Sequence, residues 1–163
     1  MPFLPIHDDT PRRWISTPVV GWAIILFCVI VYIWQAGLSP RGRAEAVFGL
    51  GFIPAAFFGH GQLAPHLVVV PTEATALTSL FLHGGAWHLI GNMLFLYIFG
   101  DNVEDSMGHF RFLAFYLATG VAATLSHGYA FPESEAPLIG ASGTSSAATC
   151  CCIPIPGSRR CCS

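Results

Sequence analysis

The chain has 163 residues, of which 53% are hydrophobic and 10% are charged. Soluble domains average about 25% charged residues, so this composition excludes an ordinary water-soluble globular domain and favours a protein of the lipid bilayer. The formal net charge is −2, and lysine is absent from the sequence. Such a balance argues against nucleic acid as a partner, because nucleic-acid binding depends on many basic side chains.

Residues 1–17 are polar and proline-rich, and we expect them to form a cytoplasmic tail. A first membrane span is predicted over about 18–36, where the side chains are almost all hydrocarbon or aromatic. This stretch is longer than the apolar part of a cleaved signal peptide, and no small-residue cleavage site follows it. Arg12 and Arg13 are a weak twin-arginine signal, so we interpret the stretch as an uncleaved span.

The long connection over 37–76 contains an apolar stretch at 47–59 that glycine and proline interrupt. It is too short and too broken to cross a membrane. The pattern is consistent with an interfacial or re-entrant segment that is partly buried, and equally with an amphipathic surface loop.

Two further spans are predicted at about 77–100 and 110–127, and a fourth is expected to start at residue 140. The predicted fold is therefore all-α, a polytopic membrane helical bundle with three spans and a fragment of the fourth, over 18–148. From 149 to 163 the composition changes abruptly to cysteine, proline and arginine, and two prolines would end any helix there. We interpret 149–163 as an aberrant tail.

Cysteine is distributed unevenly. Cys28 stands alone in the first apolar run, which is typical of a small buried hydrophobic residue. The other five crowd the tail at spacings that fit neither a disulfide framework nor a zinc site, so we expect no metal there: Cys150, Cys151, Cys152, Cys161 and Cys162.

Arginine positions predict the orientation of the bundle. Arg12 and Arg13 precede the first span, and Arg111 lies between the second and third spans. These regions share one side of the membrane, and Arg41 and Arg43 lie on the other. Because cytoplasmic loops are enriched in basic residues, the three-to-two split favours a cytoplasmic N-terminus.

Three polar residues, His83, His88 and Asn92, lie inside or at the mouth of the second predicted span. Polar groups are costly in lipid, so they normally face the bundle interior or a water-filled cavity. His88 and Asn92 are four residues apart, which places them on one helical face, about 6 Å apart along the axis. They could offer two donors to one oxyanion. Alternatively, they are packing groups that bond neighbouring helices.

Ser142 is flanked by Gly140 and Gly143, so a substrate can approach its backbone closely. It lies near the start of the fourth helix, where free N–H groups and the helix dipole favour negative charge. A helix N-cap or a small-residue packing contact is the alternative. The second span descends from the non-cytoplasmic side and the fourth enters from it, so Ser142, His88 and Asn92 should lie at similar depth.

Four motifs together resemble bacterial rhomboid proteases through about residue 146. They are Thr78-Ser79-Leu80-Phe81-Leu82-His83, Trp87-His88-Leu89-Ile90-Gly91-Asn92-Met93, Gly100-Asp101-Asn102-Val103-Glu104-Asp105 and Gly140-Ala141-Ser142-Gly143. The stretch Gly51-Phe52-Ile53-Pro54 is also similar to the membrane-dipping first loop of that family.

The resemblance implies that Ser142 is the nucleophile of an intramembrane serine endopeptidase. His88 and Asn92, with the backbone N–H of Ser142, would stabilise the oxyanion. His83 would be a structural member of the motif, Glu104 would anchor a helix end, and Gly140 and Gly143 would complete the serine motif. The substrates would be transmembrane helices of other proteins, with no metal and no cofactor, and the expected location is the bacterial inner membrane.

The sequence departs from the rhomboid pattern in one respect. The family has six spans, and a histidine on the sixth activates the serine, whereas no histidine follows His127 here. A serine hydroxyl is a weak nucleophile without a base, so we expect this chain to be inactive, truncated or frameshifted after about residue 146. The alternatives are a non-catalytic protein that binds membrane helices and a fragment of an unrelated polytopic membrane protein.

Overall fold

The structure, a computed structural model, describes residues 17–140. Ser142 and Gly143, residues 1–16 and the 149–163 tail lie outside the described residues, so the predictions for them remain predictions. The described elements are helices, which confirms the all-α prediction. They are α1 (Val19–Gly37), α2 (Pro40–Leu50), α3 (Pro54–Phe57), α4 (Thr75–Thr78), α5 (Ala86–Met107) and α6 (His109–Ala130), with the 3-10 turns η1 (Pro65–Leu67), η2 (Thr72–Ala74) and η3 (Ser79–Phe81).

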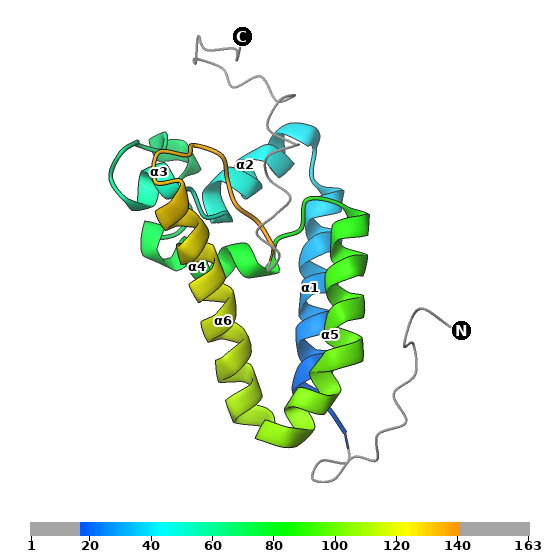
Figure 1. Cartoon of the computed structure of the whole chain (residues 1–163). Helices are drawn as coiled ribbons and strands as arrows, with labels where there is room; N and C mark the ends of the chain where they lie inside the picture. The colour runs from blue at the N-terminus through cyan, green and yellow to red at the C-terminus, as the bar shows by residue number, and fades with distance from the viewer. Residues whose placement is uncertain (1–16, 141–163) are drawn as a thin grey trace, which may run out of the picture.

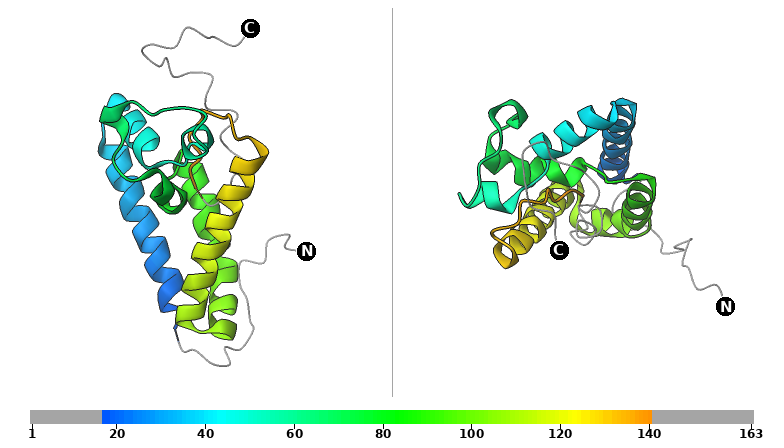
Figure 2. Two further views of the ribbon diagram at one scale, coloured as in Figure 1. Left: turned by 90° about the vertical axis from the view of Figure 1, so that its left-hand side faces the viewer. Right: turned by 90° about the horizontal axis from the view of Figure 1, so that it is seen from above.

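Three long helices frame the fold. α1 and α5 pack side by side, and α6 turns back from α5 and diverges from it, so that the short helices lie between the open ends (Figures 1 and 2). The turn between α5 and α6 is the single residue Gly108, which has φ +84°. Side chains other than glycine rarely adopt this conformation, so glycine at this position permits the reversal.

The contact between α1 and α5 is apolar in its middle. A buried cluster forms there from Ile24 and Cys28 of α1, Leu89 of α5 and Phe112 of α6. Cys28 is fully buried and has a free thiol, which confirms its interpretation as a small buried hydrophobic residue.

The segment 47–59 is packed into the fold rather than lying on its surface. Phe52 is fully buried, and its backbone N–H and carbonyl both pair with Leu138 in an antiparallel bridge. On its other side Phe52 lies against Gly128 of α6, where a Cβ would come within 2.8 Å of the Phe52 ring. These contacts favour the partly buried segment over the surface loop. They also tie the stretch after α6 to the segment after α2.

The helix of the second predicted span begins and ends later than the pattern indicated. α5 covers Ala86–Met107, whereas the sequence predicted a continuous stretch from 77 to 100. Residues 75–81 instead form the tight turns α4 and η3, and the chain is extended at Leu82 and Gly85 before α5 starts. α1 agrees with its predicted range to within one residue at each end, and α6 begins one residue earlier and ends three residues later than predicted.

Within residues 17–140, α1 is the helix whose length and composition suit a membrane crossing. α5 and α6 have 22 residues each, or about 33 Å, which matches a hydrocarbon core of about 30 Å. They carry more polar residues than α1, among them Asp101 and Asp105 near the end of α5. The number of spans and their limits in the membrane therefore remain predictions.

Candidate active site

His88 and Asn92 both lie in the first two turns of α5, and their separation of four residues places them on one face of that helix. The Nδ2 atom of Asn92 is buried and has no hydrogen-bond partner among the described residues. Leaving a buried donor unpaired costs about 1–3 kcal/mol, so a side chain in this state suits a ligand or intermediate that brings an acceptor.

The His88 ring is oriented by the loop that precedes α5. The backbone N–H of Gly84 donates to His88 Nδ1 over 3.4 Å, a long hydrogen bond. Because Nδ1 accepts there, this contact favours the neutral tautomer with its proton on Nε2. The His83 ring packs edge-on against the His88 ring, with centroids 5.4 Å apart. With the proton on Nε2, the His88 ring can donate a hydrogen bond through Nε2–H.

Gly140, the last residue that the structure describes, lies directly against the His88 ring. A Cβ at position 140 would lie 2.5 Å from His88 Cε1 and 2.7 Å from Nε2, closer than real Cβ atoms approach. Gly140 also has φ +84°, and its N–H donates to the Ser79 carbonyl over 2.7 Å. Glycine is therefore required for conformation and for space. The structure thus brings Gly140 into contact with His88, and Gly140 precedes Ser142 by two residues in the sequence.

His83 is buried and makes contacts that fit a structural role. Its ring Nδ1 lies 3.2 Å from the Phe81 carbonyl, and its backbone N–H donates to Gln35 Oε1 of α1 over 3.1 Å. The carbonyl can only accept, so Nδ1 carries the proton of the neutral ring. Gln35 was missed by the sequence reasoning. The signal that could have found it is an amide side chain at the end of an otherwise apolar run.

Glu104 lies at the far end of α5, about 24 Å along the axis from His88. Its fully buried carboxylate accepts the N–H groups of Val20 over 2.9 Å and Gly21 over 2.8 Å, at the start of α1. His109 Nδ1, at the start of α6, lies 2.5 Å from the same carboxylate. A negative group at a helix N-terminus is favoured by the helix dipole. Glu104 thus joins three helices, as an anchoring residue would.

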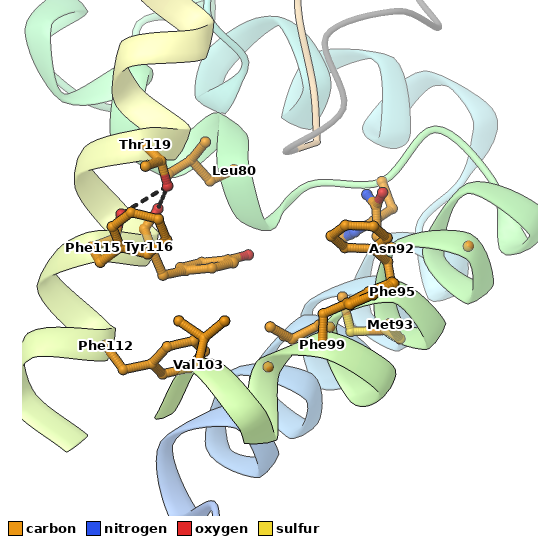
Figure 3. A pocket seen from close by; sticks show the side chains of 14 residues that line it. Leu80, Asn92, Met93, Phe95, Phe99, Val103, Phe112, Phe115, Tyr116 and Thr119 are labelled. Atoms are coloured by element: carbon orange, nitrogen blue, oxygen red, sulfur yellow. Dashed lines mark hydrogen bonds between the residues drawn. The ribbon is translucent and has the colours of Figure 1, made fainter. Parts of the chain in front are cut away.

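A pocket of about 530 Å³ opens between α5 and α6, below the loop that carries His83. Figure 3 shows side chains of the two helices facing one another across it, with the Asn92 amide at one edge. The lining is mainly apolar and aromatic: Leu80, His83, Gly91, Asn92, Met93, Phe95, Leu96, Phe99, Gly100, Val103, Phe112, Phe115, Tyr116 and Thr119.

Comparison with known proteins identifies one family, both by a family model and by individual relatives. The family model described as Rhomboid domain matches residues 72–156, more than half of the chain. Rhomboid-like protein 11, chloroplastic, from Arabidopsis thaliana is 34% identical over 117 residues, which cover 64% of this chain and 40% of that protein. Rhomboid protease GluP from Bacillus subtilis (strain 168) is 42% identical over 67 residues, which cover 41% of this chain and 13% of that protein.

RHOMBOID-like protein 5 from Arabidopsis thaliana is 31% identical over 83 residues, which cover 51% of this chain and 27% of that protein. The chain thus spans less than half the length of the curated relatives it matches. No solved structure matches it significantly. The family match rules out the alternative of an unrelated polytopic membrane protein. This chain belongs to the rhomboid family of integral membrane proteins, which includes intramembrane proteases.

Proposed function

We propose that this chain supplies the nucleophile and the oxyanion-stabilising groups of a rhomboid-type serine endopeptidase that cleaves transmembrane helices of other proteins. The observation that supports the proposal best is the contact between the Gly140 backbone and the His88 ring. Ser142 follows two residues later, and two residues of chain span about 7 Å at most, which is short enough for the proposed meeting of its hydroxyl and N–H with the same imidazole.

In this proposal the hydroxyl of Ser142 attacks the carbonyl carbon of a substrate peptide bond, and the carbonyl oxygen becomes an oxyanion. Three donors converge on that oxygen: the Nε2–H of His88, the Nδ2–H of Asn92 and the backbone N–H of Ser142. Donors that are already in place when the charge develops lower the barrier, and the loss of one costs about 10²–10³ in turnover. The Nδ2 of Asn92, which has no hydrogen-bond partner within residues 17–140, is consistent with this role.

The reaction also needs a base that takes the proton of the Ser142 hydroxyl. The printed 163 residues contain no histidine after His127, where the family pattern has one. Removal of the base from a serine–histidine pair costs on the order of 10⁶ in turnover. We therefore propose that a polypeptide of these residues alone is inactive or nearly so.

A reporter that carries a cleavable transmembrane helix tests the proposal. Residues 1–146 are joined to the part of the Bacillus relative that follows its matched region, and cleavage of the reporter is compared in detergent for this chimera and for the unaltered 163 residues. We expect the chimera to cleave and the 163 residues to fall below detection. Ser142→Ala in the chimera should abolish cleavage, and Asn92→Ala should reduce it about 10²–10³-fold.

A folded chimera whose cleavage persists in Ser142→Ala would refute the assignment of the nucleophile. A folded chimera without cleavage, where the intact relative cuts the same reporter, would refute the protease proposal for this chain. Cleavage by the unaltered 163 residues would refute the proposed need for the later histidine.

A second function, binding of transmembrane helices without cleavage, is favoured by the mainly apolar pocket between α5 and α6. In this case the groove holds an apolar helix of another protein, and Ser142 and His88 do not act on that helix. The same reporter distinguishes the two functions. Binding alone predicts that the chimera co-purifies with the reporter without cutting it, and that Ser142→Ala leaves the captured amount unchanged.

A further inference from the structure

Gln35 is a buried amide at the end of an apolar helix. It is 1% exposed, whereas the sixteen residues of α1 that precede it contain no charged or amide side chain. Burying an amide without a compensating hydrogen bond is unfavourable. Polar residues within membrane helices commonly serve a binding or catalytic site. The hydrogen bonds of the Gln35 side chain therefore indicate why a polar residue stands at this position.

The Oε1 atom of Gln35 accepts the backbone N–H of His83 over 3.1 Å, across 48 residues of sequence. This bond fixes the loop between η3 and α5, which lacks helical hydrogen bonds of its own at His83. The Nε2 atom of the same amide is buried and has no partner among the described residues. The orientation of Gln35 is thus set by the one bond to His83.

The backbone of Gln35 is held as well. Arg43 donates through Nε to the Gln35 carbonyl over 3.1 Å and through Nη2 to the Ala36 carbonyl over 3.0 Å. A cationic side chain that bonds the last carbonyls of a helix stabilises that end against fraying. Gln35 is therefore a fixed support rather than a side chain on a loose helix terminus.

The loop that Gln35 holds touches His88 at two points. The His83 ring packs edge-on against the His88 ring at 5.4 Å, and the Gly84 N–H donates to His88 Nδ1 over 3.4 Å. A shift of the loop away from α1 would change both contacts. It would also change the orientation of the ring against which Gly140 lies.

We infer that Gln35 is a positioning residue for His88: its amide oxygen holds the loop 82–85 on α1, and the loop holds the imidazole toward Gly140. The inference rests on the proposed function, because His88 needs this orientation only if it serves the oxyanion. It concerns the position of the ring, so it can fail independently of any cleavage assay.

The test uses the full chain in detergent micelles with ¹⁵N-labelled histidine side chains. The His88 ring signals are assigned by their loss in His88→Gln. Gln35→Met keeps the length of the side chain but removes the acceptor, and should shift both ring nitrogens of His88. Gln35→Glu keeps an oxygen at the same reach and should restore them. The matched control Cys28→Ala alters another fully buried residue of α1, and should lower the melting temperature without shifting His88.

Unshifted His88 signals in Gln35→Met, with a melting temperature lowered as in Cys28→Ala, would overturn the inference and leave Gln35 a packing residue. A second measurement on the unaltered chain applies even if Gln35→Met fails to fold. The amide of His83 should exchange with deuterium as slowly as amides in the middle of α1. Exchange as fast as that of Gly59, which stands in an open turn, would equally overturn it.

Discussion

Single side chains determine how the long helices meet and where the site lies. Glu104 shows this at one end of the fold, because its buried carboxylate accepts two backbone N–H groups at the start of α1 and contacts the His109 ring at the start of α6. Gly140 shows it at the other end, because the absence of a side chain lets the backbone lie against His88. Substitution of either residue should therefore change the stability of the fold.

Glu104→Ala should destabilise the folded chain by about 2–4 kcal/mol, because the N–H groups of Val20 and Gly21 lose their buried acceptor. Unfolding in mixed micelles with increasing denaturing detergent measures the free energy. Ser106→Ala, on the exposed face two residues away, serves as the control and should change stability by less than about 0.5 kcal/mol. Equal losses in the two variants would contradict the anchoring role.

Gly140→Ala should disturb the His88 ring as well as the backbone. At φ +84° an alanine costs about 1–2 kcal/mol, and its Cβ would collide with His88. Gly59→Ala is the matched control, because Gly59 has φ +79° but no atom within 4 Å of its would-be Cβ. We expect the Gly140 variant to lose more stability than the control and to shift the His88 ring signals. Equal losses without a shift would show that the contact is absent.

At the scale of elements, the segment around Phe52 connects α6 to the site. Phe52 packs on Gly128 of α6 and pairs with Leu138, and Gly140 follows two residues later. The position of Gly140 is therefore set partly by a contact near the C-terminal end of α6. This explains why a stretch without regular structure, 131–140, reaches His88 in a fixed register.

Gly128→Ala should push the Phe52 ring aside, since the added Cβ would lie 2.8 Å from it. Overpacking of this kind costs about 1–3 kcal/mol. Amide exchange at Phe52 and Leu138 should accelerate, because their bridge loosens. Ala123→Val, on the exposed face of α6, should leave both amides protected. Unchanged exchange in Gly128→Ala would mean that the ring has room to move without breaking the bridge.

The sequence predicted α1 and α6 well because each is a long apolar run bounded by polar or glycine residues. It misplaced the start of α5 because the residues around 77–83 are apolar enough to resemble a span. The hydroxyls of Thr78 and Ser79 instead bond backbone carbonyls, which favours short turns over a continuous helix. Thr78 donates to the Leu50 carbonyl over 2.6 Å and Ser79 to the Ala76 carbonyl over 3.3 Å, and the Gly84-Gly85 pair then separates these turns from α5.

Local spacing also accounts for what could be predicted of the site. His88 and Asn92 share a helical face, and this follows from a separation of four residues. The bond from Gln35 to His83 joins positions 48 residues apart, and no local pattern specifies such a contact. Tertiary packing sets it. The placement of Ser142 beside His88 lies outside the described residues and remains a prediction.

At the scale of the whole molecule, α1, α5 and α6 form an open bundle with a mainly apolar pocket between α5 and α6. The junction Gly108 and the start of α1 lie at one end, and the loops after α1 and α6 lie at the other (Figure 1). This arrangement agrees with alternating sides for successive helices. The basic residues then predict which end faces the cytoplasm.

Fusions to a reporter that is active only outside the cytoplasm test this orientation in a bacterial host. We expect low activity for fusions at residues 17 and 108, and high activity for fusions at 60 and 135, because basic residues favour the cytoplasmic side. Cytoplasmic green fluorescence from a second reporter should show the reverse order. High activity at 17 and 108 would place the N-terminus outside and contradict the proposed location of the tail.

The proposed site requires Ser142 to lie beside His88, and a disulfide between cysteines at these two positions measures their proximity most directly. In a chain whose own cysteines are replaced by alanine, His88→Cys with Ser142→Cys should cross-link on mild oxidation, since disulfides need Cα atoms about 4.4–6.8 Å apart. Phe99→Cys with Ser142→Cys, three turns further along α5, should not. A cross-link in the second pair but not the first would contradict the proposed site.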